Sequence, residues 1–168
     1  MKKKQFSKWA HWTDRNKLEG KKYPGVYAIA ISDMNLSGTD FDWIKEIEYI
    51  GMTNSEKGLI SRLGQFDRTI QGKNGHGGAD RFRFHYPEYQ PLVGKLYVAV
   101  ATFPCNVIDS SVLDESDISK TTQALRVMGE VAKFEYDCFA NYVEVFKRLP
   151  TYNDKKNTKK YSLENKDS

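Results

Sequence analysis

Three runs of apolar residues along the chain predict β-strands, because each is short and rich in β-branched or aromatic side chains. They cover residues 26–32, 47–53 and 95–103. A loop-like insert with a glycine and several turn-forming residues, 33–44, separates the first two runs. We therefore expect these two strands to form an antiparallel pair.

Two other segments show the spacing of an amphipathic helix. In residues 5–20 the side chains of Phe6, Trp9 and Trp12 recur every third position, which predicts a short helix at the start of the chain. A second helix is expected to begin with a cap at Asn54 or Ser55. Its apolar face consists of Leu59, Leu63, Phe66 and Ile70.

A long third helix is predicted over residues 120–149, and its apolar stripe contains one carboxylate. The stripe consists of Leu125, Met128, Ala132, Glu135, Phe139, Tyr142, Phe146 and Leu149. At about 100° per residue, Glu130 points about 140° away from Glu135. A carboxylate among apolar neighbours is costly unless it is paired or binds a metal ion. Glu135 is therefore favoured over Glu130 as a metal ligand.

Length and composition indicate one globular domain. The chain has 168 residues and 39% hydrophobic residues, enough for a single core. We expect a basic N-terminal arm or helix (1–22), a domain (23–153) and a frayed, lysine-rich tail (154–168). No apolar run is long enough to span a membrane. Cys105 and Cys138 lack metal-ligand spacing and are expected to be buried, reduced thiols, as in a cytoplasmic protein.

Charge is unevenly distributed along the chain, whose formal net charge is +4. The first 22 residues are basic, whereas residues 107–118 are acidic. A second basic region, which includes a Gly/His/Arg-rich loop at 72–89, carries Lys57, Arg62, Arg68, Lys73, Arg81 and Arg83. A chain with one basic face suits a polyanionic partner such as nucleic acid.

Several residues form a set that could cleave a phosphodiester. The chemistry needs a group that orients or deprotonates water and groups that neutralise charge on phosphate. A tyrosine whose pKa is lowered from its reference value of ~10 can accept the proton of the attacking water. The planar guanidinium group of arginine suits a phosphate. One carboxylate can hold Mg²⁺. The set lies in Gly25-Val26-Tyr27, Tyr49-Ile50-Gly51, Arg62, Glu135 and Pro150-Thr151-Tyr152-Asn153.

Over residues 24–153 this pattern resembles the GIY-YIG nuclease family. The resemblance implies a small α/β (α+β) domain, in which helices flank a three-stranded antiparallel sheet. It also implies an endodeoxyribonuclease that uses Mg²⁺, or Mn²⁺ in its place. By position, Tyr27 and Tyr49 would be the motif tyrosines, with Tyr27 the likelier general base, and Gly51 would close the second motif. The remaining roles fall to Arg62 on the scissile phosphate, Glu135 on the metal and Asn153 as a hydrogen-bonding residue of the site.

The chain departs from the family pattern near Arg62. Some members carry a histidine one helical turn further on, where this chain has Phe66. That proton-handling role is either absent or supplied by His76 in the Gly-rich loop. Lys57 would fill the place of a lysine that some members have just before the helix.

The resemblance implies duplex DNA as the partner. Loop 72–85 and the N-terminal arm would hold phosphates through Lys57, Lys73, Arg81 and Arg83, contacts that position DNA without reading its sequence. A break in both strands needs two cuts, which a homodimer could make. Restriction, repair and mobile-element roles are all compatible with the pattern. Two alternatives are a nucleic-acid-binding module that no longer cuts and a structural domain with an incidental match.

Overall fold

The computed structural model describes residues 4–107 and 115–161, and its centre is an antiparallel sheet. The strands are β1 (Ala10–His11), β2 (Gly25–Ile31), β3 (Ile47–Thr53) and β4 (Leu96–Thr102), in the order β1-β4-β2-β3. The three predicted strands and the antiparallel pairing of the first two are confirmed. The sheet has four strands instead of three, because the two-residue β1 adds to the edge at β4.

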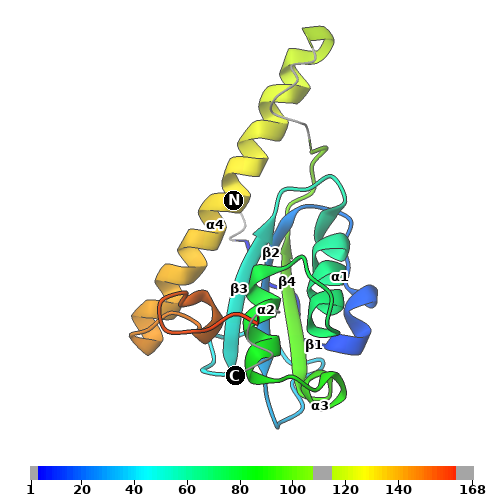
Figure 1. The fold of residues 1–168 in the computed structure, drawn as a ribbon. Helices are drawn as coiled ribbons and strands as arrows, with labels where there is room; N and C mark the ends of the chain where they lie inside the picture. Colours follow the sequence, from blue (N-terminus) through cyan, green and yellow to red (C-terminus); the bar gives the residue numbers. More distant parts are fainter. Residues whose placement is uncertain (1–3, 108–114, 162–168) are drawn as a thin grey trace.

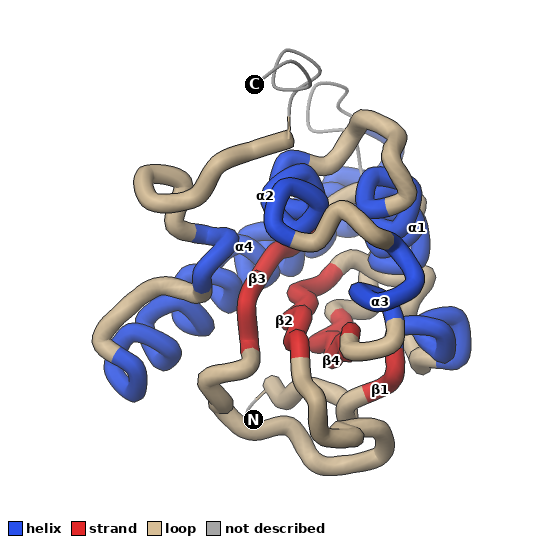
Figure 2. Tube along the Cα trace, turned by 60° about the horizontal axis from the view of Figure 1, so that its bottom comes forward, coloured by secondary structure: helices blue, strands red, loops and turns tan. Residues whose placement is uncertain are grey.

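Helices cover both faces of this sheet (Figures 1 and 2). One face carries α1 (Gly58–Ile70), α2 (Gly77–His85) and α3 (Tyr89–Val93). The other carries α4 (Ile118–Phe146). Each face has its own apolar cluster, and β2 contributes alternate side chains to both. A central strand buried on both sides explains why residues 26–32 read as a continuous apolar run.

Short 3₁₀ helices occupy three connections: η1 (Trp12–Lys17), η2 (Glu115–Asp117) and η3 (Thr151–Asn153). The predicted apolar face of α1 is confirmed, since all four of its side chains are buried. The predicted cap at Asn54 or Ser55 is wrong, because α1 begins at Gly58. The Ser55 hydroxyl instead accepts a hydrogen bond from the Lys57 amide at 3.2 Å.

The helix expected over residues 5–20 is wrong as a continuous element, because this part of the described chain contains β1 and only the 3₁₀ helix η1. Residues around Ser7 run along β4 instead, and the Ser7 amide donates to the Val100 carbonyl at 2.8 Å. Trp9 joins the apolar cluster under α4, whereas Trp12 joins the cluster under α1. A segment that lies at the sheet edge can send aromatic side chains to both faces, and the open edge of β4 supplies its hydrogen-bond partners.

The long helix is confirmed, but its buried side chains are mostly not those of the predicted stripe, of which Tyr142 alone is buried. Side chains at Ala124, Val131 and Cys138 are buried at seven-residue spacing, whereas Leu125 is 42% exposed. The reason is that the N-terminal half of α4 projects past the end of the sheet (Figure 1). A helix that crosses a sheet at one place buries only a narrow seam.

The Gly-rich segment 72–85 is not a loop throughout, because residues 77–85 form α2. His76 caps this helix by accepting a hydrogen bond from the Ala79 amide through Nδ1 at 3.2 Å. Residues 154–161 pack on α2 instead of fraying, and the Tyr161 amide donates to the Asp80 carbonyl at 3.1 Å. The rest of the expected tail, and residues 108–114 of the acidic connector, lie outside the described residues.

Both cysteines are free thiols, as predicted, although Cys105 is only partly buried. Throughout residues 4–107 and 115–161, every helix is too short or too polar to cross a membrane.

Candidate active site

Tyr27 and Tyr49 lie on the same face of the sheet, on neighbouring strands, with ring centroids 6.1 Å apart. Gly51 on β3 is directly opposite Tyr27 on β2. A Cβ atom on Gly51 would lie 2.5 Å from the Tyr27 hydroxyl oxygen, far inside van der Waals contact. Only glycine at this position lets the Tyr27 ring lie across β3, which explains the glycine of the second motif.

His76 reaches the same tyrosine from the first turn of α2. Its Nε2 atom lies 2.8 Å from the Tyr27 hydroxyl oxygen. Because Nδ1 accepts from the Ala79 amide, the ring proton resides on Nε2 and is donated to Tyr27. The Phe66 ring packs against the imidazole, with centroids 5.1 Å apart. The structure therefore brings His76, and not the residue at position 66, to the tyrosine pair.

Arg62 on α1 is the cation at the centre of this group. Its Nη1 donates to Gln65 Oε1 at 2.9 Å, while Nε is buried with no partner among the described residues. The guanidinium charge opposes the burial-driven rise in the pKa of Tyr27, Tyr49 and Glu135. The positive charge of Arg62 therefore stabilises the ionised form of each of these three side chains.

His76 stays neutral under ordinary conditions. Burial, and then the positive charge of Arg62, lower its pKa to about 3. A neutral imidazole with its proton on Nε2 is a hydrogen-bond donor to Tyr27, not an acceptor of its proton.

The two tyrosines differ in how readily they ionise. Burial raises the pKa of Tyr27 well above its ordinary value, and the neighbouring Tyr49 raises it further. Burial also raises the pKa of Tyr49, Arg62 opposes the rise for both tyrosines, and Glu135 adds to it for both. Since the two phenolates would repel each other, only one can form at a time. The less buried Tyr49 is the better candidate.

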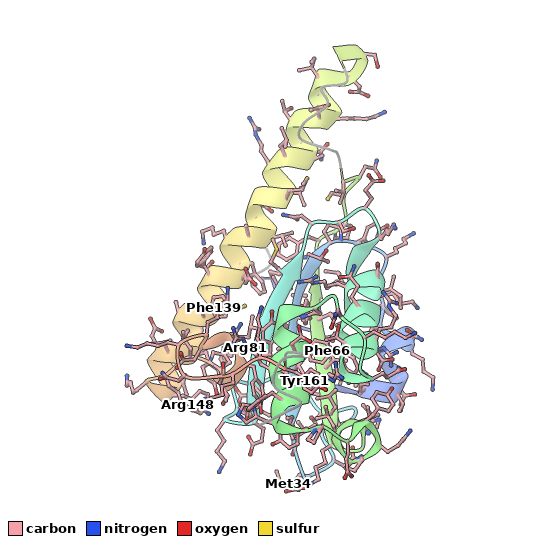
Figure 3. All side chains as sticks on the ribbon, in the orientation of Figure 1. Met34, Phe66, Arg81, Phe139, Arg148 and Tyr161 are labelled. Carbon is pink, nitrogen blue, oxygen red and sulfur yellow. The ribbon has the colours of Figure 1, made fainter. Side chains whose placement is uncertain are left out.

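A cavity of about 650 Å³ opens beside this group at the free edge of β3. Its walls come from both faces of the sheet, because α2 contributes from one side and α4 from the other. Tyr49 and Arg62 line it, whereas Tyr27 is fully buried and is not among the described residues that do. In Figure 3, Phe139 on α4 and Arg81 on α2 mark its two sides.

Glu135 is the carboxylate of this cavity. Burial raises its pKa, and Arg62 lowers it. Glu130, the alternative ligand, is exposed on α4 and lies outside the cavity lining of the described chain. Of the two glutamates, Glu135 is thus the one that faces the cavity.

Asn153 ties the C-terminal part of the chain to the second motif. Its Nδ2 donates to the Ile50 carbonyl, and its Oδ1 accepts from the Ile50 amide, both at 2.8 Å. The side chain thus pairs with β3 as a neighbouring strand would, on the edge where no strand of the described residues pairs. This is a positioning role, since both ends of the amide are used within the protein.

The described residues offer few protein ligands for a magnesium ion. The described residues contain no group of three His, Cys, Asp or Glu side chains that could hold a metal. Among the described residues, Glu135 is the one carboxylate on the cavity wall. Mg²⁺ is often bound through one or two carboxylates, with water and substrate phosphate as the other ligands. The cavity fits this one-carboxylate arrangement.

The predicted phosphate-binding residues have different surroundings. Lys57 and Lys73 are exposed and are not among the described residues that line the cavity. Arg81 lines it, but its Nη1 is bound to the Thr158 carbonyl at 2.5 Å. Arg83 stacks over the Tyr161 ring, 3.7 Å from its centroid. The sequence pattern predicts a loop here, but both arginines belong to the packed helix α2.

Sequence reasoning missed several cavity residues. Gly78 is needed because a Cβ there would lie 2.5 Å from the Tyr49 ring. Lys155 and Lys160 come from the segment that was expected to fray, and Tyr136 follows Glu135 directly. The adjacency of Tyr136 to Glu135 was the one signal available in the sequence.

Comparisons of the chain with protein-family models, with curated proteins and with solved structures found no match. The cavity itself combines a tyrosine hydroxyl, a guanidinium group and a carboxylate.

Proposed function

We propose that the protein is a Mg²⁺-dependent DNA endonuclease. The observation that carries the proposal is one cavity lined by Tyr49, Arg62 and Glu135, with a buried pair of side chains packed against the Tyr49 ring. That pair is Tyr27 and His76, whose hydroxyl oxygen and Nε2 atom lie 2.8 Å apart. A structural domain has no need for this combination, since partial burial of a carboxylate and of an arginine Nε without a partner costs free energy.

Arg62 is suited to the scissile phosphate. Its Nε hydrogen has no partner among the described residues, and the side chain lines the cavity. A guanidinium group binds phosphate oxygens in a fork and keeps its charge at any working pH. Charge that develops on phosphorus during attack would therefore be stabilised by a donor already in place.

Tyr49 is suited to the attacking water. A hydroxyl at the cavity wall can orient this water, and as a phenolate it can accept its proton. Tyr27 would remain protonated behind Tyr49, held by the hydrogen bond from His76. This assignment reverses the order expected from the resemblance, which favoured Tyr27, because burial opposes ionisation of Tyr27 more strongly.

Glu135 would hold the metal ion. When bound, Mg²⁺ supplies positive charge next to the phosphate and the leaving oxygen. The cations Arg62, Arg81, Lys155 and Lys160 line the same cavity and favour a polyanionic substrate.

Incubation of supercoiled plasmid with the purified protein and Mg²⁺ tests the proposal. Wild type should nick or linearise the plasmid. Tyr49→Phe, Arg62→Ala and Glu135→Gln should each lower the rate by about 100-fold or more, as expected for loss of a proton-transfer or charge-stabilising group. Glu130→Gln is the matched control on the same helix and should cut at the wild-type rate. Tyr27→Phe should retain more activity than Tyr49→Phe.

The outcomes separate the candidate functions. A gel shift of DNA without cleavage, in Mg²⁺ or Mn²⁺, would support a binding module instead. Loss of activity only in proportion to loss of folding, measured by circular dichroism, would support a structural domain. Sequencing the product ends would then give the target, and with it a restriction, repair or mobile-element role. Sedimentation would show whether the protein cuts as a homodimer.

A further inference from the structure

The cavity has two walls of different chemistry. The wall from α4 is apolar and aromatic, with Tyr136, Phe139 and, beyond the helix end, Leu149. The opposite wall is cationic and comes from α2 and the segment that follows η3. Tyr136 is 72% exposed and Leu149 is 40% exposed, although both line the same cavity as Glu135.

The cationic wall is held in place by contacts of residues 154–161 with α2. Arg81 donates to the carbonyl and the hydroxyl of Thr158, at 2.5 and 3.2 Å. The Tyr161 amide donates to the Asp80 carbonyl, and Arg83 stacks on the Tyr161 ring. These contacts hold the segment that carries Lys155 and Lys160 against the cavity, so the wall is part of the folded structure.

Phosphate contacts alone do not explain the aromatic wall. In a duplex the phosphates lie outside and the bases are stacked on one another, so no base face is free for a tyrosine ring. A base that has left the stack does have a free face, and it stacks on aromatic side chains whatever its identity. A cavity of about 650 Å³ is also in the size range of small-molecule sites.

We propose that this cavity binds one unpaired nucleotide next to the scissile phosphate. Its base would stack on Tyr136, and its phosphates would contact Lys155 and Lys160. The inference depends on the proposed nuclease function and narrows its substrate class to DNA with a bulged, flapped or single-stranded nucleotide at the cut. Taking a base out of the stack costs least when it has no pairing partner, so such substrates are preferred over a perfect duplex.

The test uses three oligonucleotides of the same sequence: a perfect duplex, a duplex with a one-nucleotide bulge, and the single strand. The bulged position carries 2-aminopurine, whose fluorescence falls when it stacks. Cleavage is measured in Mg²⁺, and binding is measured in EDTA so that no strand is cut. The variants are Tyr136→Ala and Tyr136→Phe. Val145→Ala serves as the control, since Val145 is 54% exposed on the same helix.

Wild type should cut the bulged duplex faster than the perfect one and quench its 2-aminopurine. Tyr136→Ala should lower affinity for the bulged duplex by about 10-fold or more, the expected effect of losing one base–aromatic stack. Tyr136→Phe keeps a ring and should retain affinity within about 3-fold, as should Val145→Ala. Equal cutting of both duplexes, with no effect of Tyr136→Ala, would overturn the inference and leave the nuclease proposal standing.

Failure of the nuclease proposal gives a different result. Wild type would then cut none of the three oligonucleotides in Mg²⁺ or Mn²⁺. The binding experiment still decides the inference in that case: quenching that depends on Tyr136 supports the nucleotide site, and quenching that is absent or unaffected by Tyr136→Ala overturns it.

Discussion

The Nε2 atom of His76 lies 2.8 Å from the hydroxyl oxygen of Tyr27, although 49 positions separate the two residues in the chain. The contact depends on the close approach of α1 and α2, where Phe66 packs against the imidazole. His76, the N-cap residue of α2, therefore lies between the phenylalanine of α1 and the tyrosine of β2.

Replacement of His76 should reduce cleavage through the tyrosine pair. His76→Phe keeps a ring but removes the Nε2 donor, so the plasmid-nicking rate should fall by about 10-fold, less than in Tyr49→Phe, because His76 positions Tyr27 and transfers no proton. His76→Gln can place an amide donor near the position of Nε2 and should stay within about 2-fold of the wild-type rate. Equal rates for the two variants would show that the hydrogen bond to Tyr27 has no role.

His76 should also make stability depend on pH. Native His76 has its pKa lowered to about 3, whereas the unfolded side chain titrates near ~6.5. Between these values the unfolded state binds more protons, so the free energy of unfolding falls as pH falls. The slope from this residue approaches about 1.4 kcal/mol per pH unit.

Urea unfolding of wild type and His76→Gln from pH 7.5 to 4 measures this effect. The difference in unfolding free energy should shift in favour of His76→Gln as pH falls below ~6.5, because glutamine does not titrate. Parallel curves for the two proteins would contradict a neutral, buried imidazole.

Gly51→Ala should destabilise the protein and displace Tyr27. The new methyl group would lie 2.5 Å from the Tyr27 hydroxyl oxygen, and such overpacking costs about 1–3 kcal/mol. Gly129→Ala is the matched control, because no atom lies within 4 Å of its Cβ position and the residue is inside α4. Alanine there should stabilise the helix by up to ~1 kcal/mol. Chemical unfolding of both variants tests the opposite signs.

Asn153→Ala should loosen the edge of β3 without touching the cavity chemistry directly. It removes both hydrogen bonds to Ile50 and leaves a backbone amide and carbonyl without protein partners, which costs about 1–3 kcal/mol. Faster hydrogen exchange at the Ile50 amide would locate the effect. Asn141→Ala, an exposed site on α4, should change stability by less than ~0.5 kcal/mol.

The spacing of apolar residues predicted helices and strands correctly where it followed a single pattern over the whole segment. The strands at 26–32 and 47–53 and the face of α1 follow from short-range periodicity, and tertiary packing preserved them. The prediction of one helix over residues 5–20 was wrong because Trp9 and Trp12 pack on opposite faces of the sheet. Its spacing resembled a helix, but the open edge of β4 offered hydrogen bonds that a helix would not use.

The site divides in the same way. The sequence by itself determined which residue types were available, through two strand tyrosines, the glycine at position 51, Arg62 and the single carboxylate in the apolar stripe of the last helix. It could not determine which groups meet. The contact of His76 with Tyr27, the exposure of Tyr49 and the positions of Lys155 and Lys160 depend on how α2, α4 and the C-terminal segment pack around the edge of β3. Those relationships join residues far apart in the chain, and long-range packing leaves no periodic signal in the sequence.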